Sequence, residues 1–165
     1  MDDIVIRPAA PTDLKAVTAI EAACFPAAEA ATEESFRQRL AAFTHSFLIA
    51  EKDGRPIGFI NGCVTDKDEL TDDLYESTAL HDDDAPNVMV FGLDVIPQEQ
   101  HQGFATALMK AYIEKAESRR KKQIILTCKE RLIPFYEQFG YECHGKSQST
   151  HGGAVWYDMV LSLTR

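Results

Sequence analysis

Residues 87–105 read NVMVFGLDVIPQEQHQGFA, and this stretch decides the fold. Its first nine residues form the most apolar run of the chain and predict a central, buried strand. A glycine-bearing turn follows Pro97, and the apolar spacing from Ala105 to Ala116 predicts a helix. Gly92 breaks the strand pattern, because glycine weakens a strand and usually marks a bulge or a close backbone approach.

The residues that follow complete a strand–helix–strand unit. QIILTC at residues 123–128 predicts a second buried strand, so the connection is expected to be a right-handed parallel crossover. Pro134 opens a short helix, PFYEQF, and Gly140 stands where a left-handed C-cap belongs. AVWYDMVLSL at residues 154–163 predicts a long closing strand.

The residues that precede this unit add a small antiparallel layer. Residues 4–6 predict a strand ending at a proline, and Thr12-Asp13 is expected to cap a helix. Residues 32–40 predict a second short helix, and the tripeptide Asp-Gly-Arg joins two strand-like runs, 46–52 and 56–65, in a hairpin. The expected fold is α/β, a mixed central sheet flanked by helices, as a single domain over residues 1–165.

Composition excludes several classes of function. The chain has 165 residues, of which 45% are hydrophobic and 26% charged, as in an ordinary globular domain. Its net charge of −9 disfavours nucleic acid and anionic lipid as partners and allows a cationic substrate. No apolar run could cross a bilayer, and MDDIVIRP lacks the features of a signal peptide, so a cytoplasmic protein is expected. A homodimer is compatible with the sequence, which does not fix the oligomeric state.

Cysteine spacing and one motif match predict neither metal nor nucleotide chemistry. Cys24, Cys63, Cys128 and Cys143 show no C-x-x-C spacing, so reduced, mostly buried thiols are expected and no metal site. Residues 140–147, GYECHGKS, fit the P-loop pattern, but the first glycine ends a helix instead of following a buried strand. The match is therefore interpreted as chance.

Residues 66–84 carry nine carboxylates and a single lysine, with little apolar periodicity. Such a segment is either a solvated loop or a lid over a site. A solvated loop is the favoured interpretation.

Two motifs at matching spacing resemble the GNAT N-acetyltransferases. Gln100, Gly103 and Ala105 occupy the positions of the Q/R-x-x-G-x-G/A motif that binds acetyl-CoA, and V-x-P precedes it. Downstream, ILTC and PFYEQFGY resemble the strand and the x-F/Y-Y-E-x-x-G-F/Y helix of that family. The chain is most similar to the arylalkylamine (serotonin) N-acetyltransferases, through ACFP at 23–26, LTCKERLIPFYEQFGY at 126–141 and Trp156.

The resemblance implies a V-shaped opening between the fourth and fifth strands, residues 87–95 and 123–128, where the pantetheine arm of acetyl-CoA pairs with the fourth. The cofactor-binding residues implied are Leu93, Asp94, Val95, Gln100, His101, Gln102, Gly103, Phe104 and Ala105. Independently, free N–H groups at a helix start can bind an anion, although a plain strand-to-helix turn explains one glycine as well. No metal is implied.

The resemblance also assigns catalytic roles. Tyr136 matches the catalytic tyrosine and would protonate the leaving thiolate, with an amphipathic core ring as the alternative. Backbone N–H groups of Gly92 or Leu93 would stabilise the oxyanion. Glu29, by likeness to insect dopamine acetyltransferases, is the candidate base, with a solvated acid at a helix end as the alternative.

One departure from the vertebrate serotonin enzymes concerns the base. Met89 and Phe91 stand where those enzymes have two histidines that relay the proton, so that relay is absent. His101, His144 and His151 are expected on the surface or in turns. The implied substrate-binding residues are Phe25, Pro26, Met89, Phe91 and Trp156, of which Phe25 could instead be core.

The expected function is transfer of an acetyl group from acetyl-CoA to the primary amine of a small molecule, by direct attack in a ternary complex. An arylalkylamine is the first choice and a polyamine the second. The alternatives are a protein N-terminal or lysine acetyltransferase and a non-catalytic acyl-CoA sensor.

Overall fold

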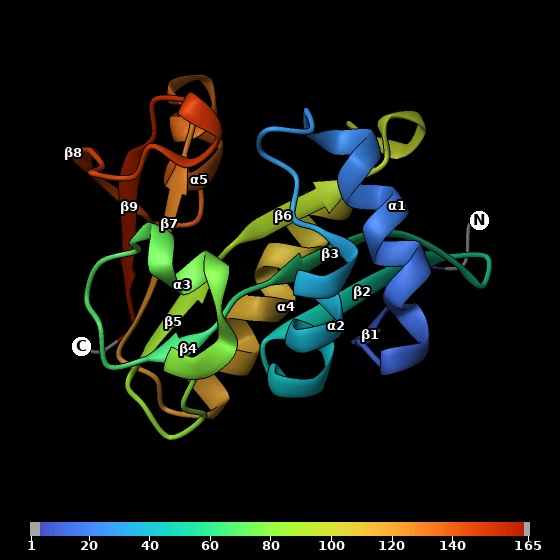
Figure 1. Cartoon of the computed structure of the whole chain (residues 1–165), viewed down its shortest axis with the longest axis horizontal. Coiled ribbons are helices and arrows are strands. Elements are labelled where there is room, and N and C mark those ends of the chain that lie inside the picture. The colour runs from blue at the N-terminus through green and yellow to red at the C-terminus, as the bar shows by residue number, and fades with distance from the viewer. Residues whose placement is uncertain (1–3, 164–165) are drawn as a thin grey trace.

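The computed structural model describes residues 4–163, which form a mixed α/β structure with two sheets (Figure 1). The strands are β1 (Ile4–Pro8), β2 (Phe47–Lys52), β3 (Arg55–Asn61), β4 (Val64–Thr65), β5 (Asn87–Val90), β6 (Gly92–Val95), β7 (Gln123–Cys128), β8 (Glu142–Lys146) and β9 (Tyr157–Ser162). The α-helices are α1 (Leu14–Cys24), α2 (Glu33–Ala42), α3 (Asp72–Glu76), α4 (Phe104–Ser118) and α5 (Ile133–Glu137). One sheet has the order β1-β2-β3-β6, and the other β4-β5-β7-β9-β8. The expected fold class is confirmed.

The local signals at the N-terminal end are largely confirmed. The β2–β3 hairpin turns through Asp53 and Gly54, whose φ angles of 52° and 80° suit a tight hairpin turn. The Thr32 hydroxyl accepts the N–H of Ser35 and caps α2. Asp13 is the N-cap residue of α1, as expected, but its carboxylate accepts the N–H of Ala10 in the turn before the helix and none from the helix itself.

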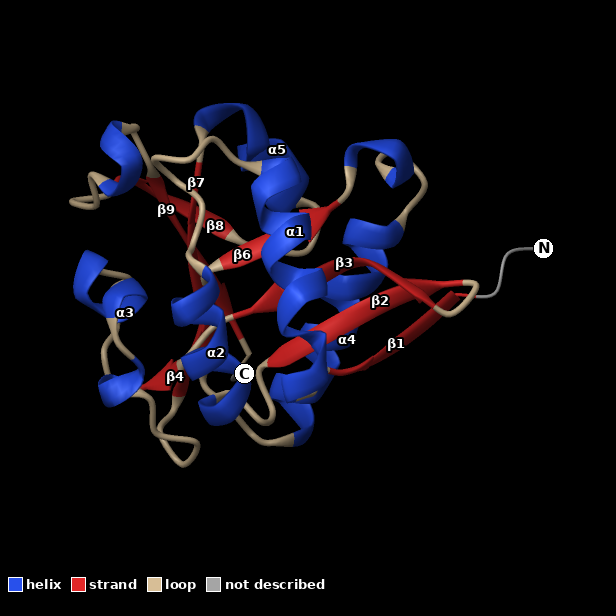
Figure 2. Ribbon diagram, turned by 45° about the vertical axis from the view of Figure 1, so that its right-hand side comes forward, coloured by secondary structure: helices blue, strands red, loops and turns tan. Residues whose placement is uncertain are grey.

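The central strand predicted over residues 87–95 is two strands that part at Phe91. β5 pairs with β7 in parallel, whereas β6 pairs with β3 antiparallel, with Leu93 opposite Ile60. Asn61 O, at the end of β3, accepts the Phe91 N–H at 2.7 Å. The chain passes at this point from the second sheet to the first. The break next to Gly92 is the bulge that glycine indicates, and it opens the gap between β6 and β7. Figure 2 shows β1, β2 and β3 running to one end of the molecule, away from β7 and β9.

Helices cover the first sheet on both faces. α4 buries Leu108, Met109 and Tyr112 in one cluster with Leu48 and Ile60. α1 and α2 lie on the opposite face, in front of β2 and β3 in Figure 1, and bury a second cluster that includes the alternate strand residues. Because successive strand residues point to opposite faces, two cores form around one sheet.

The acidic segment is not only a solvated loop. Residues 72–76 form α3, and Leu70 and Leu74 are fully buried in the cluster under α1 and α2. Its nine carboxylates stay mostly at the surface, whereas Tyr75 turns inward. The segment is therefore anchored in the core, which the solvated-loop interpretation did not predict.

The C-terminal part differs from the expectation in two places. β8 is a strand that the sequence reading missed, and it occupies most of the P-loop match, so residues 140–147 do not form a phosphate loop. β9 starts at Tyr157 because residues 151–153 form a turn, where the Trp156 indole N–H donates to His151 O at 2.8 Å. Gly140 has a φ of 103° after α5, as expected of a left-handed cap.

Among residues 4–163 no helix is both long and apolar enough to cross a membrane. The four cysteines are free: Cys63 and Cys128 are buried, Cys24 is half-buried and Cys143 is exposed.

Candidate active site

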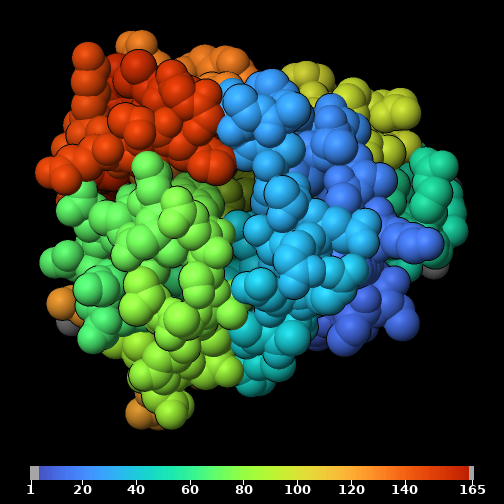
Figure 3. Space-filling view, viewed as in Figure 1, coloured from blue at the N-terminus to red at the C-terminus, as the bar shows by residue number. Residues whose placement is uncertain are grey.

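A cavity of about 530 Å³ lies where β6 leaves β7. Its mouth is the hollow seen in Figure 3 where the α1–α2 connection, the acidic segment and the residues before β9 meet. The strand edges at the bottom of the cavity are residues 90–93 and 126–129. The splayed sheet itself therefore creates the site.

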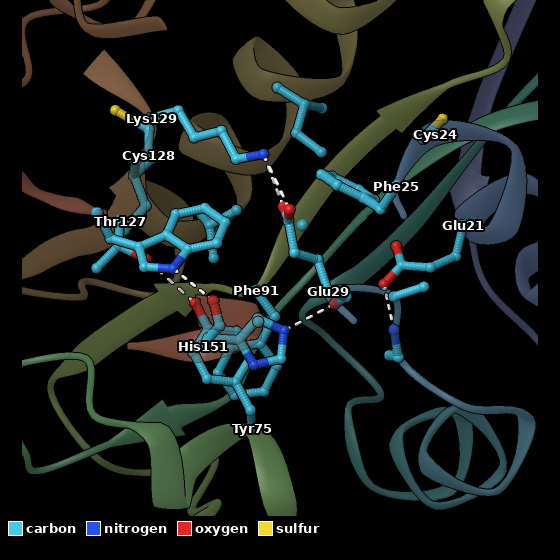
Figure 4. A pocket seen from close by; sticks show the side chains of 18 of the residues that line it. Glu21, Cys24, Phe25, Glu29, Tyr75, Phe91, Thr127, Cys128, Lys129 and His151 are labelled. Carbon is cyan, nitrogen blue, oxygen red and sulfur yellow. Dashed lines mark hydrogen bonds and ion pairs between the residues drawn. The ribbon is translucent and has the colours of Figure 1, made fainter. Parts of the chain in front are cut away.

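Aromatic side chains from four segments line the cavity. Phe25 comes from the α1–α2 connection, Phe91 from the break in the central strand and Trp156 from the start of β9. Tyr75 of α3 lies 4.8 Å from the Phe91 ring and stacks on His151 at 5.0 Å between ring centroids. Figure 4 shows Tyr75, Phe91 and His151 close together, whereas Phe25 lies on the other side of Glu29. The wall suits a flat apolar group.

Glu29 lies beside this wall, but it already has a partner. Lys129 Nζ lies 2.9 Å from one Glu29 oxygen and 3.0 Å from the other, and Figure 4 shows the pair spanning the cavity. Lys129 also lies 5.7 Å from the centre of the Trp156 ring. The His151 Nε2 is 2.7 Å from Glu29 O, which fixes the connection to the turn before β9. The carboxylate is therefore held in an ion pair rather than solvated.

Tyr136 lines the cavity from α5, where its ring packs on Phe135 and Tyr141. Only 7% of the residue is exposed. Burial, reinforced by the neighbouring Cys128 and Asp94, raises the pKa of Tyr136 above its ordinary value of 10. The phenol therefore keeps its proton at neutral pH and can donate it.

The open edge of β6 carries backbone groups that face the cavity. The Ile96 N–H bonds Ile57 O, and because backbone directions alternate along a strand, the N–H groups of Leu93 and Val95 point away from β3. Val95 O is occupied, since it accepts the Gln100 amide at 2.9 Å and the Cys24 thiol at 3.2 Å. The Leu93 N–H is thus placed to bind an oxygen in the cavity.

Asp94, expected among the cofactor-binding residues, does not line the cavity. Its backbone is directed at β3, and its side chain, 1% exposed, lies next to Glu21 of α1. Burial, followed by the charge of Glu21, raises the pKa of Asp94 well above the usual carboxyl range, and Arg39 opposes this rise. Glu21 lines the cavity and was missed by sequence reading.

The glycine-bearing turn before α4 lies outside the cavity and presents backbone to solvent. His101 and Gly103 have left-handed φ angles of 64° and 91°, and a Cβ at Gly103 would meet no atom within 4 Å. Residues 101–103 are exposed, whereas Phe104 is 3% exposed and points into the core, so it can contribute only its backbone. The start of α4, with its unpaired N–H groups, fits a pyrophosphate.

Seven of the expected catalytic, cofactor-binding and substrate-binding residues line one cavity. These are Phe25, Pro26, Glu29, Phe91, Leu93, Tyr136 and Trp156. Met89 does not: it is fully buried with Leu70 and Leu74, because the acidic segment covers it. His151 lies in a turn as expected, yet it lines the cavity.

The sequence reading missed Glu21, Arg39, Tyr75 and Lys129. A signal existed for Lys129 alone, since it follows directly on β7, and the carboxyl ends of parallel strands are where α/β proteins place their sites. Within residues 4–163 there is no group of three or more histidines, cysteines or acids that could hold a metal ion.

Comparison with known proteins gives one family. The profile of the "Acetyltransferase (GNAT) family" matches residues 14–141. Serotonin N-acetyltransferase of Mesocricetus auratus is 30% identical over 113 residues, 68% of this chain and 53% of that protein. The Homo sapiens enzyme is 27% identical over the same length, again 53% of that protein. The aligned region thus spans about half the length of these curated relatives.

Solved structures share the fold at low sequence identity. The GphF GNAT-like decarboxylase bound to isobutyryl-CoA has a TM-score of 0.84 at 18% identity, covering 97% of this chain and 100% of that one. Naa50 of Arabidopsis thaliana, in complex with a bisubstrate analogue, has a TM-score of 0.75 at 16% identity, covering 96% and 98%. YncA of Salmonella typhimurium with acetyl-CoA has a TM-score of 0.72 at 16% identity, covering 99% and 95%.

Proposed function

The chain belongs to the GNAT family, and we propose that it transfers the acetyl group of acetyl-CoA to the primary amine of a small arylalkylamine. The proposal rests above all on the aromatic wall of Phe25, Tyr75, Phe91 and Trp156 beside buried carboxylates. An arylalkylamine has one flat apolar end and one ammonium end, which match these two surfaces. The likeness to serotonin N-acetyltransferases supports the same class.

In this proposal the open edge of β6 and the turn before α4 hold the co-substrate. Leu93 and Val95 would pair with the pantetheine arm, and residues 100–105 would hold the pyrophosphate through backbone N–H groups. Gln100 acts indirectly, since its side chain ties the turn to Val95 O. Acetyl-CoA supplies the activated acetyl thioester when it is bound.

Tyr136 is the proposed proton donor. Its raised pKa keeps the phenol protonated where a departing thiolate needs a proton, and the same hydroxyl can orient the sulfur by a hydrogen bond. The Leu93 N–H is the proposed oxyanion donor, as a fixed dipole beside the reacting carbon. Glu29 would attract the ammonium group, in competition with Lys129.

A panel of acceptors tests this function through release of free thiol from acetyl-CoA. We expect turnover with arylalkylamines to exceed turnover with polyamines and with peptides bearing a free N-terminus. Preference for a polyamine or a peptide would contradict the acceptor class and leave acetyl transfer intact. Saturable acyl-CoA binding without turnover of any amine would instead favour a sensor.

A further inference from the structure

We propose that Glu21 and Asp94 together form the proton acceptor that deprotonates the substrate ammonium. The inference rests on the proposed function, and it assigns the base to a carboxylate pair rather than to Glu29. The pair lies beside Gly92, at the point where the central strand breaks.

Gly92 and Glu21 both line the cavity, and Asp94 lies beside them. A Cβ at Gly92 would lie 3.0 Å from an Asp94 oxygen and 3.8 Å from Glu21 Oε1. Glu21 lines the cavity and is 7% exposed, whereas Asp94 is 1% exposed beneath it. Glu21 is therefore the member of the pair that a bound ammonium can meet, and Asp94 lies behind it.

The oxygens of the pair are short of hydrogen-bond donors. Glu21 Oε2 accepts the Ala31 N–H at 2.8 Å, as Figure 4 shows. Within the described part of the chain, Glu21 Oε1 and both Asp94 oxygens are buried and accept no hydrogen bond. Buried carboxylate oxygens usually have donors, since leaving them unpaired is costly. A proton held between the two carboxylates would satisfy both, since an Asp94 oxygen and Glu21 Oε1 lie 3.0 Å and 3.8 Å from the same point, the Cβ position of Gly92.

The charges that face the pair do not neutralise it. Arg39 of α2 is buried, but its guanidinium bonds Asn61 and Tyr75 O and lies over the Phe91 ring at 4.7 Å. Cys24, beside the pair on α1, stays a thiol because burial raises its pKa to about 12. Tyr136 of α5 also keeps its proton. Arg39 opposes the rise, but burial and the charge of Glu21 outweigh it, so the pKa of Asp94 stays raised.

This raised pKa suits the removal of a proton from an ammonium group. In the active form both acids are ionised. One N–H bond of the ammonium breaks, its electron pair stays on nitrogen as the lone pair of the free amine, and the proton forms an O–H bond at Glu21 and is then shared with Asp94. The pair returns the proton to solvent once the product has left. Glu29 is less suited, because Lys129 already balances its charge.

The test compares Glu21→Gln with Glu29→Gln, with Glu114→Gln on the exposed face of α4 as the control for handling. Glutamine keeps an oxygen that can accept the Ala31 N–H, so the α1–α2 connection retains its contact. We expect Glu21→Gln to lower kcat/KM for an alkylammonium acceptor at pH 7 by roughly 10²-fold or more. For an aromatic amine or hydrazine that is already neutral at this pH, the loss should be below roughly threefold, because no proton must be removed before attack.

The pH profile supplies a second readout. Because Asp94 has a raised pKa, the acid limb of kcat/KM in the parent should lie well above the usual carboxyl range, and Asp94→Asn should move it to lower pH. Glu29→Gln should change KM for the amine and leave the acid limb of the kcat/KM profile at the same pH.

The outcomes separate the two proposals. No thiol release by the parent with any amine would overturn the proposed function. A parent that is active, with Glu21→Gln equally impaired for neutral and cationic acceptors or with an unchanged acid limb in Asp94→Asn, would overturn the carboxylate pair alone. Loss of the acid limb in Glu29→Gln would return the role of base to Glu29.

Discussion

Glu29 and Lys129, which both line the cavity, form a 2.9 Å ion pair. The pair joins the α1–α2 connection to the end of β7, and the Trp156 ring lies beside the Lys129 ammonium. An ammonium substrate that approaches Glu29 meets a carboxylate already occupied by another cation. Lys129 is therefore an internal competitor of the proposed substrate.

Lys129→Met should lower KM for a cationic amine. Methionine keeps much of the length and apolar contact of lysine and removes its charge, so Glu29 becomes free to pair with the substrate. A gain of about 1 kcal/mol, close to a fivefold fall in KM, is expected for a partly exposed pair. Steady-state kinetics with cationic and neutral acceptors would check this. An equal effect on both acceptors would contradict the competition.

Tyr136→Phe should lower kcat by roughly 10²- to 10⁴-fold, because the phenol proton is lost while the ring and its packing remain. The affinity for acetyl-CoA and the Tm should stay nearly unchanged. A smaller loss, with the alkaline limb of the pH profile preserved, would mean that Tyr136 only orients the sulfur. Parent-like turnover with chemistry shown to be rate-limiting would remove Tyr136 from the mechanism.

Gly103→Glu should weaken the binding of acetyl-CoA sharply, because it puts a negative charge and a side chain where the phosphates are expected to approach the backbone. Gly145→Glu is the matched control. Both glycines have φ angles above 90° and open space around a Cβ, but Gly145 lies in β8. Calorimetry should show a loss of affinity for the first variant only. Equal binding by both would place the phosphate site elsewhere.

The sequence predicts those features of the fold and the site that depend on neighbouring residues alone. Gly92, Gly103 and Gly140 mark backbone geometry that each glycine indicates by itself, and all three lie at a break, a left-handed turn or a cap. Tyr136 is identified as a candidate site residue by a short motif that covers one helix and the turn after it. Lys129 and Glu29 meet only because β7 ends beside the α1–α2 connection, which no local pattern reveals.

The solvated loop expected at residues 66–84 and the expected place of Met89 in the substrate site differ from the structure for the same reason, which is that this segment packs on the core. The acidic composition of residues 66–84 favours solvent, yet Leu70 and Leu74 anchor the segment in the core and cover Met89. Met89 is therefore excluded from the cavity, although it stands two residues from Phe91 in the same strand region. The Tyr75 hydroxyl, 3.2 Å from Thr127 Oγ1, then fixes the segment over β7. The many acidic residues of this segment favoured a solvated loop, although Leu70 and Leu74 are buried.

Asp94→Asn should stabilise the fold in a pH-dependent way. The folded-state pKa of Asp94 is raised above its value in the unfolded chain, about 3.9, so the native state binds this proton more tightly than the unfolded state. Between these two pKa values the parent loses stability as pH rises, by up to about 1.4 kcal/mol for each pH unit. Asparagine has a similar shape and does not ionise, so this loss should be absent from the variant.

The measurement is the difference in Tm between Asp94→Asn and the parent at several pH values. Near pH 4 most Asp94 side chains are protonated in the folded parent, and the two proteins should melt at similar temperatures. As pH rises toward the folded-state pKa, the variant should gain roughly 3–5 °C for each pH unit, and the gain should then level off. Glu21→Gln should give part of the same gain, because it removes the charge that opposes ionisation of Asp94. A difference that does not change with pH would show that Asp94 does not titrate in this range, and the carboxylate pair could not then act as the base.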